Sequence, residues 1–190
     1  MKKSQNLILT ENTIMGTKRC FLRKITLLDV DDMYEYCSNK DVTKYTKFET
    51  HESKEETKEA IANIFIPDRL TKWGIELKQT KKLIGTIDWL TINEDSATLG
   101  YALSKEYWGQ GIMPEVAQRM MQLAFEDLKL KVVYATHHKD NINSGKVMQK
   151  IGMNAWGKDY YFNFKGEPLV EIVKYGMTYD EYVEMNRHLL

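Results

Sequence analysis

The sequence predicts one mixed α+β domain, in which helices flank a central, mostly antiparallel, twisted sheet. Segments with apolar residues at helical spacing alternate with short segments typical of strands. The turns QTKK and NEDS separate three of these strands, and such short connections favour antiparallel neighbours. No linker, internal repeat or low-complexity segment interrupts the 190 residues. We therefore expect residues 1–190 to form a single domain, with 1–16 as an N-terminal extension and 178–190 as a C-terminal helix.

The composition excludes several classes of protein. Hydrophobic residues make up 43% and charged residues 28%, which are ordinary globular proportions. The formal net charge is zero, so no overall field attracts nucleic acid or an anionic membrane. The start, MKKSQNLILT, has too short an apolar run for a signal peptide, and no stretch approaches the roughly 20 apolar residues of a membrane span. Cys20 and Cys37 form no CxxC pair, which is typical of thiols in a reducing compartment. We expect a cytoplasmic protein that binds neither nucleic acid nor a membrane.

The N-terminal part is expected to hold one strand and two helices. Residues 1–16 are polar and irregular. From Thr17 the run KRCFLRKI alternates and predicts a first strand, after which apolar residues recur at helical spacing. Residues 38–52 mix turn formers and predict a loop or a broken helix. Ser53 is suited to cap a second helix, which ends at Pro67.

The remaining strands are compact apolar segments bounded by turn formers. A segment at 132–136 is expected to be a buried strand, and two later strands are joined by the turn FKGEP. The loop HHKDNIN leads into a helix that Asn143 or Ser144 caps and that stops at Gly152. The other predicted strands are 72–77, 83–90, 97–103, 155–164 and 169–177.

The central feature is a glycine turn followed by a long amphipathic helix. Gly109 and Gly111 allow the backbone to approach a ligand closely, and Pro114 is suited to the first helical turn. The free N–H groups at such a helix start carry partial positive charge and form an anion site. A tight structural connection is the alternative role of the same turn. The apolar face of the helix comprises Met113, Val116, Ala117, Met120, Met121, Ala124, Phe125 and Leu128.

Several catalytic motifs are absent or do not fit. No GxxxxGK[ST] phosphate loop and no GxSxG nucleophile elbow occur, and Pro114 interrupts any GxGxxG dinucleotide turn. His137 and His138 are adjacent in a strand, so their side chains point to opposite faces and cannot share a metal ion. We therefore expect no metal site. Lys139, Lys146 and Lys150 form a basic cluster that is either a solvated face or a phosphate contact.

Two segments together resemble the GNAT acyltransferase superfamily, specifically its RimJ/RimL-like branch (ribosomal-protein-alanine acetyltransferase-like). GYALSKEYWGQGIMPE resembles the branch's Gly-Tyr strand and its [QR]xxGx[GA] turn, with Trp108 and Met113 as departures from that turn. DNINSGKVMQKIGM matches NxxSxxVxxKxGF, with Met153 in place of the Phe. TKRCFLRKI resembles the entry strand of the branch and VTKYTKFETHES its substrate loop. The resemblance covers the chain from Thr17 to about Met177.

The resemblance implies the GNAT fold and acetyl-CoA as the cosubstrate. The pyrophosphate of coenzyme A (CoA) would lie on the N–H groups of residues 109–114, and the pantetheine arm between strands 97–103 and 132–136. An N–H group near Leu103 would polarise the thioester carbonyl. Gly100 and Ala102 would leave room for the arm, or for close helix packing. The implied cofactor-binding residues are Leu103, Trp108, Gly109, Gln110, Gly111, Ile112, Met113, Asn141 and Ser144.

The candidate catalytic residues are Ser144, which the resemblance implies, and Asp88, which it does not. Ser144 corresponds to the serine that assists the leaving thiolate, although it could instead be only a helix cap. Thr98 and Asn163 occupy the positions where the branch often has a catalytic glutamate. Asp88 could therefore act as the base through water, or it could simply be exposed.

The expected acceptor is a primary amine, either a small molecule or a protein N-terminus. An α-amine with a pKa near 8 is about a tenth neutral at pH 7, whereas a lysine amine needs a base far more. Tyr45, Phe48 and Trp89 are the candidate acceptor-binding residues. The protein could be a monomer or a homodimer. An alternative function is a non-catalytic acyl-CoA-binding module of the same fold.

Overall fold

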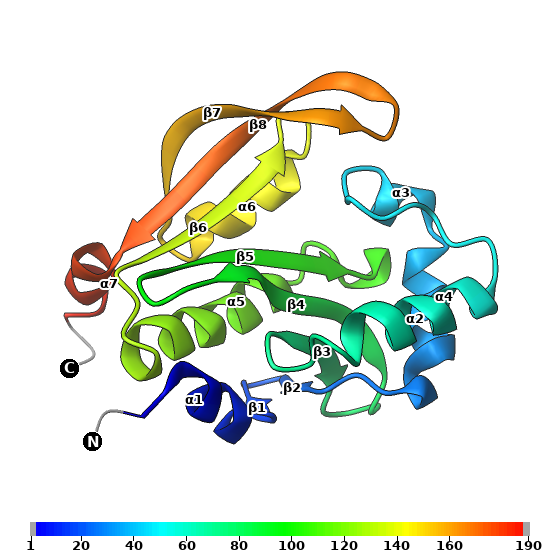
Figure 1. The fold of residues 1–190 in the computed structure, drawn as a ribbon, viewed down its shortest axis with the longest axis horizontal. Coiled ribbons are helices and arrows are strands. Elements are labelled where there is room, and N and C mark those ends of the chain that lie inside the picture. Colours follow the sequence, from blue (N-terminus) through cyan, green and yellow to red (C-terminus); the bar gives the residue numbers. More distant parts are fainter. Residues whose placement is uncertain (1–2, 188–190) are drawn as a thin grey trace.

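Eight strands form one sheet in the computed structural model, which describes residues 3–187 (Figure 1). Within that range their spatial order is β1-β2-β3-β4-β5-β6-β8-β7. All neighbouring strands are antiparallel except β5 and β6, so the predicted mixed fold with a mostly antiparallel sheet is confirmed. The strands are β1 (Met15–Gly16), β2 (Cys20–Arg23), β3 (Lys72–Leu77), β4 (Leu83–Ile92), β5 (Ser96–Leu103), β6 (Val132–His138), β7 (Asn154–Phe164) and β8 (Glu167–Thr178).

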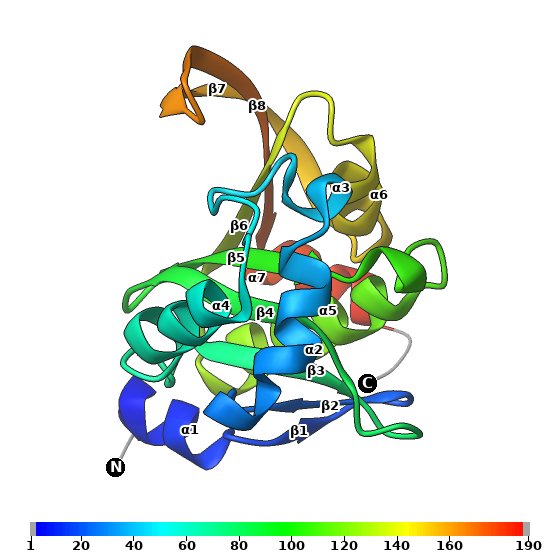
Figure 2. The same ribbon diagram turned by 90° about the vertical axis from the view of Figure 1, so that its right-hand side faces the viewer.

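Helices cover both faces of the sheet. Figure 2 shows α4 on one side of it, and α5 and α6 on the other, and α2 packs beside α4 in the second core cluster. One π-helical turn, Ile61–Phe65, continues α4, and another, Leu123–Asp127, continues α5. The α-helices of the described range are α1 (Gln5–Glu11), α2 (Val30–Cys37), α3 (Lys40–Thr43), α4 (Lys54–Ala60), α5 (Ile112–Gln122), α6 (Ile142–Lys150) and α7 (Tyr179–Asn186). None of the described helices combines the length and the apolar composition that a bilayer span requires.

The predicted core follows from the two periodicities in the sequence. Every residue assigned to the apolar face of the central helix is buried, because α5 and its π-helical turn pack along the sheet. In β2 the buried Cys20 and Leu22 alternate with half-buried neighbours, as the strand pattern predicts. Cys20 and Cys37 are both free and buried.

The N-terminal extension is more ordered than the sequence indicated. Residues 1–16 are not irregular, because they include α1 and β1. Leu9 and Met15 are each only 2% exposed, and both belong to the main core. The Trp73 indole N–H donates to Asn12 O over 2.9 Å and ties this segment to β3. The predicted extension is therefore an integral part of the body from residue 3 onward.

The segment 38–52 agrees with its prediction, whereas the end of β6 differs. The segment contains only the short helix α3, as the predicted loop or broken helix allows. In contrast, β6 extends through both histidines to His138, which shortens the following loop. The predicted C-terminal helix is α7, capped by Thr178 and Glu181 in a reciprocal capping box. Residues 188–190 of the predicted 178–190 helix lie outside the described residues.

Lys24 is a buried lysine, and its burial predicts a pH-dependent stability. The ammonium lies 3.5 Å from the centre of the Trp73 ring and donates to Leu70 O and Lys72 O, with the residue only 9% exposed. Burial lowers the Lys24 pKa from its ordinary 10.5 to about 7, and the charge of Arg69 adds to the effect. Between these two values the unfolded chain binds the extra proton, so Lys24 contributes stability that rises with pH and is lost as pH falls through about 7.

We expect the free energy of unfolding of the wild type to rise relative to that of Lys24→Met between pH 7 and 9. The expected slope is up to about 1.4 kcal/mol per pH unit. Urea unfolding at several pH values measures this difference, with the exposed Lys18→Met as the control. Parallel stability curves for wild type and Lys24→Met would contradict the burial argument.

Candidate active site

The site begins where β5 and β6 separate. The two strands pair only from Ser96 opposite Val132 to Leu99 opposite Ala135, and Figure 1 shows them diverging beyond that point. The Ser104 N–H donates to Ile84 O on the β4 side, so by alternation the N–H groups of Tyr101 and Leu103 point to the other side. On that side β5 has no strand partner beyond Leu99. These two N–H groups are therefore available to a ligand between the strands.

The glycine turn lies at the end of this open edge. Gly109 and Gly111 both have φ of 74°, a left-handed conformation that side chains disfavour. Gly111 is the N-cap of α5, so the helix begins at Ile112, two residues before Pro114, which occupies the first turn as predicted. The N–H groups of this turn and of the first helical residues form a positive end suited to an anion.

Arg19 and Glu115 form an ion pair that supports the glycine turn from outside the cleft. The sequence analysis did not identify this contact. The Arg19 guanidinium donates to Gln110 O over 2.8 Å and to Glu115 Oε2 over 2.6 Å. Glu115 Oε1 also accepts from Thr17 Oγ1 and from the Arg19 N–H. Burial opposes ionisation of Glu115, but these donors outweigh it and lower the Glu115 pKa. Arg19 and Glu115 are 96 positions apart in the chain, so no local sequence pattern reveals their contact.

A cleft of about 940 Å³ joins the open edge to the turn. It is bounded by the α3 segment, the end of β5, the glycine turn and the first turns of α6. Trp108 is fixed against the end of β5, because its indole N–H donates to Leu103 O over 2.8 Å. Gln110 does not line the cleft, since its amide turns back to Glu106 O. The predicted residues that do line it are Tyr45, Leu103, Trp108, Gly109, Gly111, Ile112, Met113, Asn141 and Ser144.

Ser144 is not the helix cap, and the alternative cap Asn143 is wrong as well. Asn141 caps α6, because its side-chain oxygen accepts from the Ser144 N–H. Ser144 thus lies inside the first turn and lines the cleft. Its hydroxyl is 2.9 Å from the Tyr101 hydroxyl across the cleft. Ser144 Oγ is therefore not used for capping.

Asp88 is not exposed, because it lies in the middle of the sheet. Its carboxylate is 3.2 Å from Lys72 Nζ, and their side chains are only 14% and 11% exposed. Burial raises the Asp88 pKa, and the Lys72 charge opposes the rise without cancelling it. A Cβ added to Gly100 would lie 2.8 Å from Asp88 Oδ1 and 2.7 Å from Leu90 Cγ. The space beside Gly100 is therefore filled by side chains, and the expectation that it holds the pantetheine arm is wrong.

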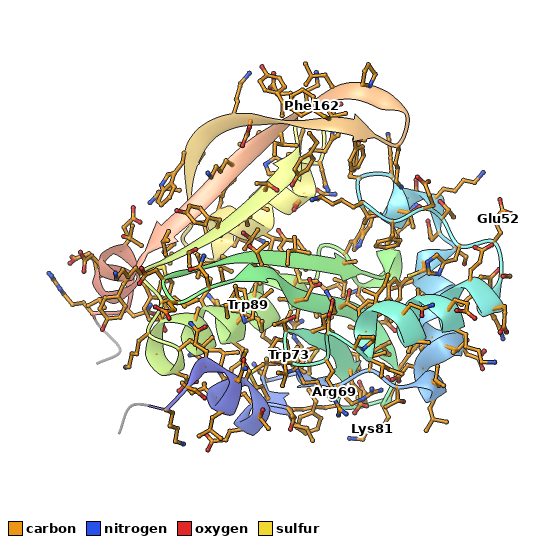
Figure 3. All side chains as sticks on the ribbon, viewed as in Figure 1. Glu52, Arg69, Trp73, Lys81, Trp89 and Phe162 are labelled. Atoms are coloured by element: carbon orange, nitrogen blue, oxygen red, sulfur yellow. The ribbon has the colours of Figure 1, made fainter. Side chains whose placement is uncertain are left out.

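Two of the three predicted acceptor residues do not lie in the cleft. Trp89 is 1% exposed and belongs to the main core. Figure 3 shows its side chain on the sheet. The prediction that Trp89 lines the mouth of the cleft is therefore wrong. Phe48 packs against the second core cluster, beside α2, and does not line the cleft. Tyr45 does line it, and its ring lies 4.9 Å from that of His138.

The remaining expectations concern charge and metals. Lys146 and Lys150 line the cleft near the glycine turn, whereas Lys139 does not. Thr98 Oγ1 accepts a hydrogen bond from Thr91, and the Asn163 side chain lies outside the described part of the chain. Within residues 3–187, no group of three or more His, Cys, Asp or Glu side chains is arranged to hold a metal ion.

Comparison with known proteins agrees with this geometry. The model of the acetyltransferase (GNAT) domain matches residues 19–154, more than half of the chain. The uncharacterized N-acetyltransferase YoaA of Bacillus subtilis (strain 168) is 34% identical over 149 residues, which cover 76% of this chain and 84% of that protein.

Solved structures with the same fold include several acetyltransferases. A GNAT-family acetyltransferase from Bacillus anthracis has a TM-score of 0.79 at 24% identity, covering 88% of this chain and 99% of that one. A ribosomal-protein alanine acetyltransferase from Vibrio fischeri has a TM-score of 0.73 at 19% identity, covering 90% and 99%. Spermidine N-acetyltransferase from Vibrio cholerae, solved with CoA and spermine, has a TM-score of 0.71 at 20% identity, covering 87% and 98%.

The divided sheet, with a helix start at the division, has the fold of an N-acetyltransferase. The chain belongs to the GNAT acetyltransferase family.

Proposed function

We propose that the protein transfers the acetyl group of acetyl-CoA to a primary amine by direct attack in a ternary complex. The observation that carries this proposal is the single cleft that joins the free edge of β5, the positive end of α5 and the hydroxyl of Ser144. Each of these three features suits one part of an acyl thioester. The free edge of β5 would form hydrogen bonds with the pantetheine amides. The N-terminal end of α5 would bind the pyrophosphate, and the Ser144 hydroxyl would donate to the sulfur.

The binding residues follow from this arrangement. The N–H groups of residues 109–114 would hold the pyrophosphate, and Lys146 and Lys150 would neutralise phosphate charge from the α6 side. The Leu103 N–H would polarise the thioester carbonyl and stabilise the negative charge that develops on its oxygen. Asn141 supports this site indirectly, because it fixes the first turn of α6.

The catalytic residues act on the two protons that the reaction moves. The attacking nitrogen must lose a proton, and the leaving sulfur must gain one. Asp88 would accept the proton that the nitrogen loses, because it lies beside Gly100, next to the open edge of β5. Since Asp88 does not itself line the cleft, the proton would pass through a water molecule. Ser144 would donate a hydrogen bond to the sulfur.

The acceptor is proposed to be a small-molecule amine or a protein N-terminus. Tyr45 would contact it at the mouth, where the ring packs against His138. One structural neighbour is named as a ribosomal-protein alanine acetyltransferase and another as a spermidine N-acetyltransferase, so the two named acceptors are a protein and a polyamine. The alternative, an acyl-CoA-binding module without turnover, is supported by the absence of Asp88 from the cleft lining.

A thiol-release assay separates these two functions. Acetyl-CoA is mixed with a panel of peptides with free N-termini, polyamines and small amines between about pH 7 and 9, where α-amines become neutral. Free CoA is measured, and CoA binding is determined separately by calorimetry. Release above background with at least one amine supports the enzyme. Binding of CoA without release for any amine would favour the binding module.

The support of the turn predicts a selective loss of affinity. We expect Arg19→Gln to raise the Kd for CoA about tenfold, equivalent to about 1.4 kcal/mol, because Gln110 O and Glu115 lose their charged partner. Calorimetry measures the effect, and Lys18→Gln, which removes the neighbouring exposed cation, is the matched control. Equal Kd values for Arg19→Gln and the control would show that the turn does not depend on Arg19.

A further inference from the structure

Tyr101 lines the cleft and contacts Ser144, where the chemistry is proposed. It lies on the part of β5 that has left β6, and its hydroxyl reaches the first turn of α6. The hydroxyl oxygen is 2.9 Å from Ser144 Oγ and 3.0 Å from Ser144 O. The partners are 43 residues apart in the chain, so the contact is produced by the fold.

The hydrogen bonds that this pair can form are limited. The Ser144 carbonyl oxygen only accepts, whereas the two hydroxyl groups can each donate one proton. Burial raises the Tyr101 pKa above its ordinary value, so the phenol stays protonated at neutral pH and remains a donor. The single phenol proton faces both Ser144 O and Ser144 Oγ, and only when it is shared between them in a three-centre bond does the serine keep its own proton free to point elsewhere. The backbone of Ser144 is fixed as well, because its N–H is bound by Asn141.

The direction of the serine proton matters for the leaving group. A hydroxyl that points its proton at the sulfur stabilises the thiolate, whereas one that points its lone pairs there repels it. We propose that Tyr101 is a positioning residue that holds the Ser144 hydroxyl with its proton toward the sulfur of the leaving coenzyme A. This inference rests on the proposed acetyl transfer.

The proposed step is balanced without any further reactant. A C–N bond forms as the C–S bond breaks. The nitrogen loses one proton to Asp88 through water, and the leaving thiolate, stabilised by the Ser144 hydrogen bond, takes one proton from solvent water. Tyr101 keeps its own proton throughout and serves only as a hydrogen-bond donor. The competing role for the contact is a purely structural tie between β5 and α6.

Kinetics of Tyr101→Phe, Ser144→Ala and the double variant test the proposal. Tyr101→Phe keeps the ring and removes the donor, so we expect kcat to fall about tenfold while the Kd for CoA and the thermal midpoint stay near wild type. In the Ser144→Ala background the same change should have no further effect on kcat, because the group that Tyr101 orients is absent. Tyr134→Phe is the matched control, since Tyr134 lies outside the cleft and packs against Trp156.

A second measurement does not depend on how well Tyr101→Phe folds. Replacing Tyr101 with 3,5-difluorotyrosine keeps the shape but makes the phenol more acidic. Once ionised, it can only accept from Ser144 and turns the serine proton away from the sulfur. We expect a new alkaline decrease in kcat that the wild type lacks.

The outcomes separate this inference from the proposed function. A wild type without turnover overturns both. An active wild type with an equally active Tyr101→Phe overturns the inference alone, as does an unchanged kcat of the fluorinated protein at a pH where its absorbance shows the phenolate. An equal loss in the wild-type and Ser144→Ala backgrounds also overturns it, because the contact would then be only structural.

Discussion

Gly111→Glu is expected to abolish binding of CoA, with a Kd at least about 100-fold above that of the wild type. The Cβ of the new side chain would lie 3.7 Å from Arg19 Nη2, so the glutamate would compete with Gln110 O and Glu115 for the guanidinium that supports the turn, and it would add negative charge at the start of α5, where the proposed pyrophosphate binds. Two like charges about 4 Å apart near a protein surface repel by about 4 kcal/mol, and a 100-fold loss needs only about 2.7 kcal/mol. Calorimetric titration with CoA measures the change.

The control for this variant must reproduce its backbone strain. Gly111 has φ of 74°, and a non-glycine residue in the left-handed region costs roughly 1–2 kcal/mol. Gly166 at the tip of the β7–β8 hairpin has φ of 82° and open space around it, so Gly166→Glu carries a comparable strain and the same charge. Gly166→Glu should bind CoA like the wild type. Unaltered affinity in Gly111→Glu would refute the placement of the pyrophosphate.

The parts of the site that could be predicted from the sequence are those determined locally. The glycines, Pro114 and the apolar face of α5 follow from backbone geometry and helical spacing, and the structure places them as expected. The same reasoning does not locate the cap of α6. Asn141, Asn143 and Ser144 can all cap, and the choice depends on where β6 ends, which is at His138.

The missed features depend on tertiary packing. Residues 83–89 of β4 are buried on both faces or nearly so, and alternation alone cannot tell which face meets a helix and which meets a ligand. For this reason Trp89 was predicted to line the mouth of the cleft, although it lies in the core. The Arg19–Glu115 contact joins β2 to α5 and has no local pattern. The Tyr101–Ser144 contact likewise requires the separation of β5 from β6.

Asp88→Asn is expected to lower kcat by about 10²- to 10⁴-fold at pH 7 if Asp88 is the general base. Burial raises the Asp88 pKa despite the nearby Lys72, so its carboxylate is a stronger base than that of an exposed aspartate. Asparagine keeps the shape of the side chain and can still accept from Lys72 Nζ. The loss would therefore come from the missing base and not from a rearranged sheet. Initial rates of thiol release measure it.

The pH dependence of this loss distinguishes a base from a structural carboxylate. An α-amine acceptor with a pKa near 8 becomes neutral without help as the pH rises from 7 to 9, so the ratio of wild-type to Asp88→Asn rates should shrink over that range. Asp68→Asn is the matched control, because Asp68 is the other carboxylate near Lys72, at 4.0 Å, and it is exposed. Asp68→Asn should retain the wild-type rate. A ratio that stays constant with pH would remove Asp88 from proton transfer and leave it as the partner of Lys72, and the amine would then have to reach the thioester already neutral.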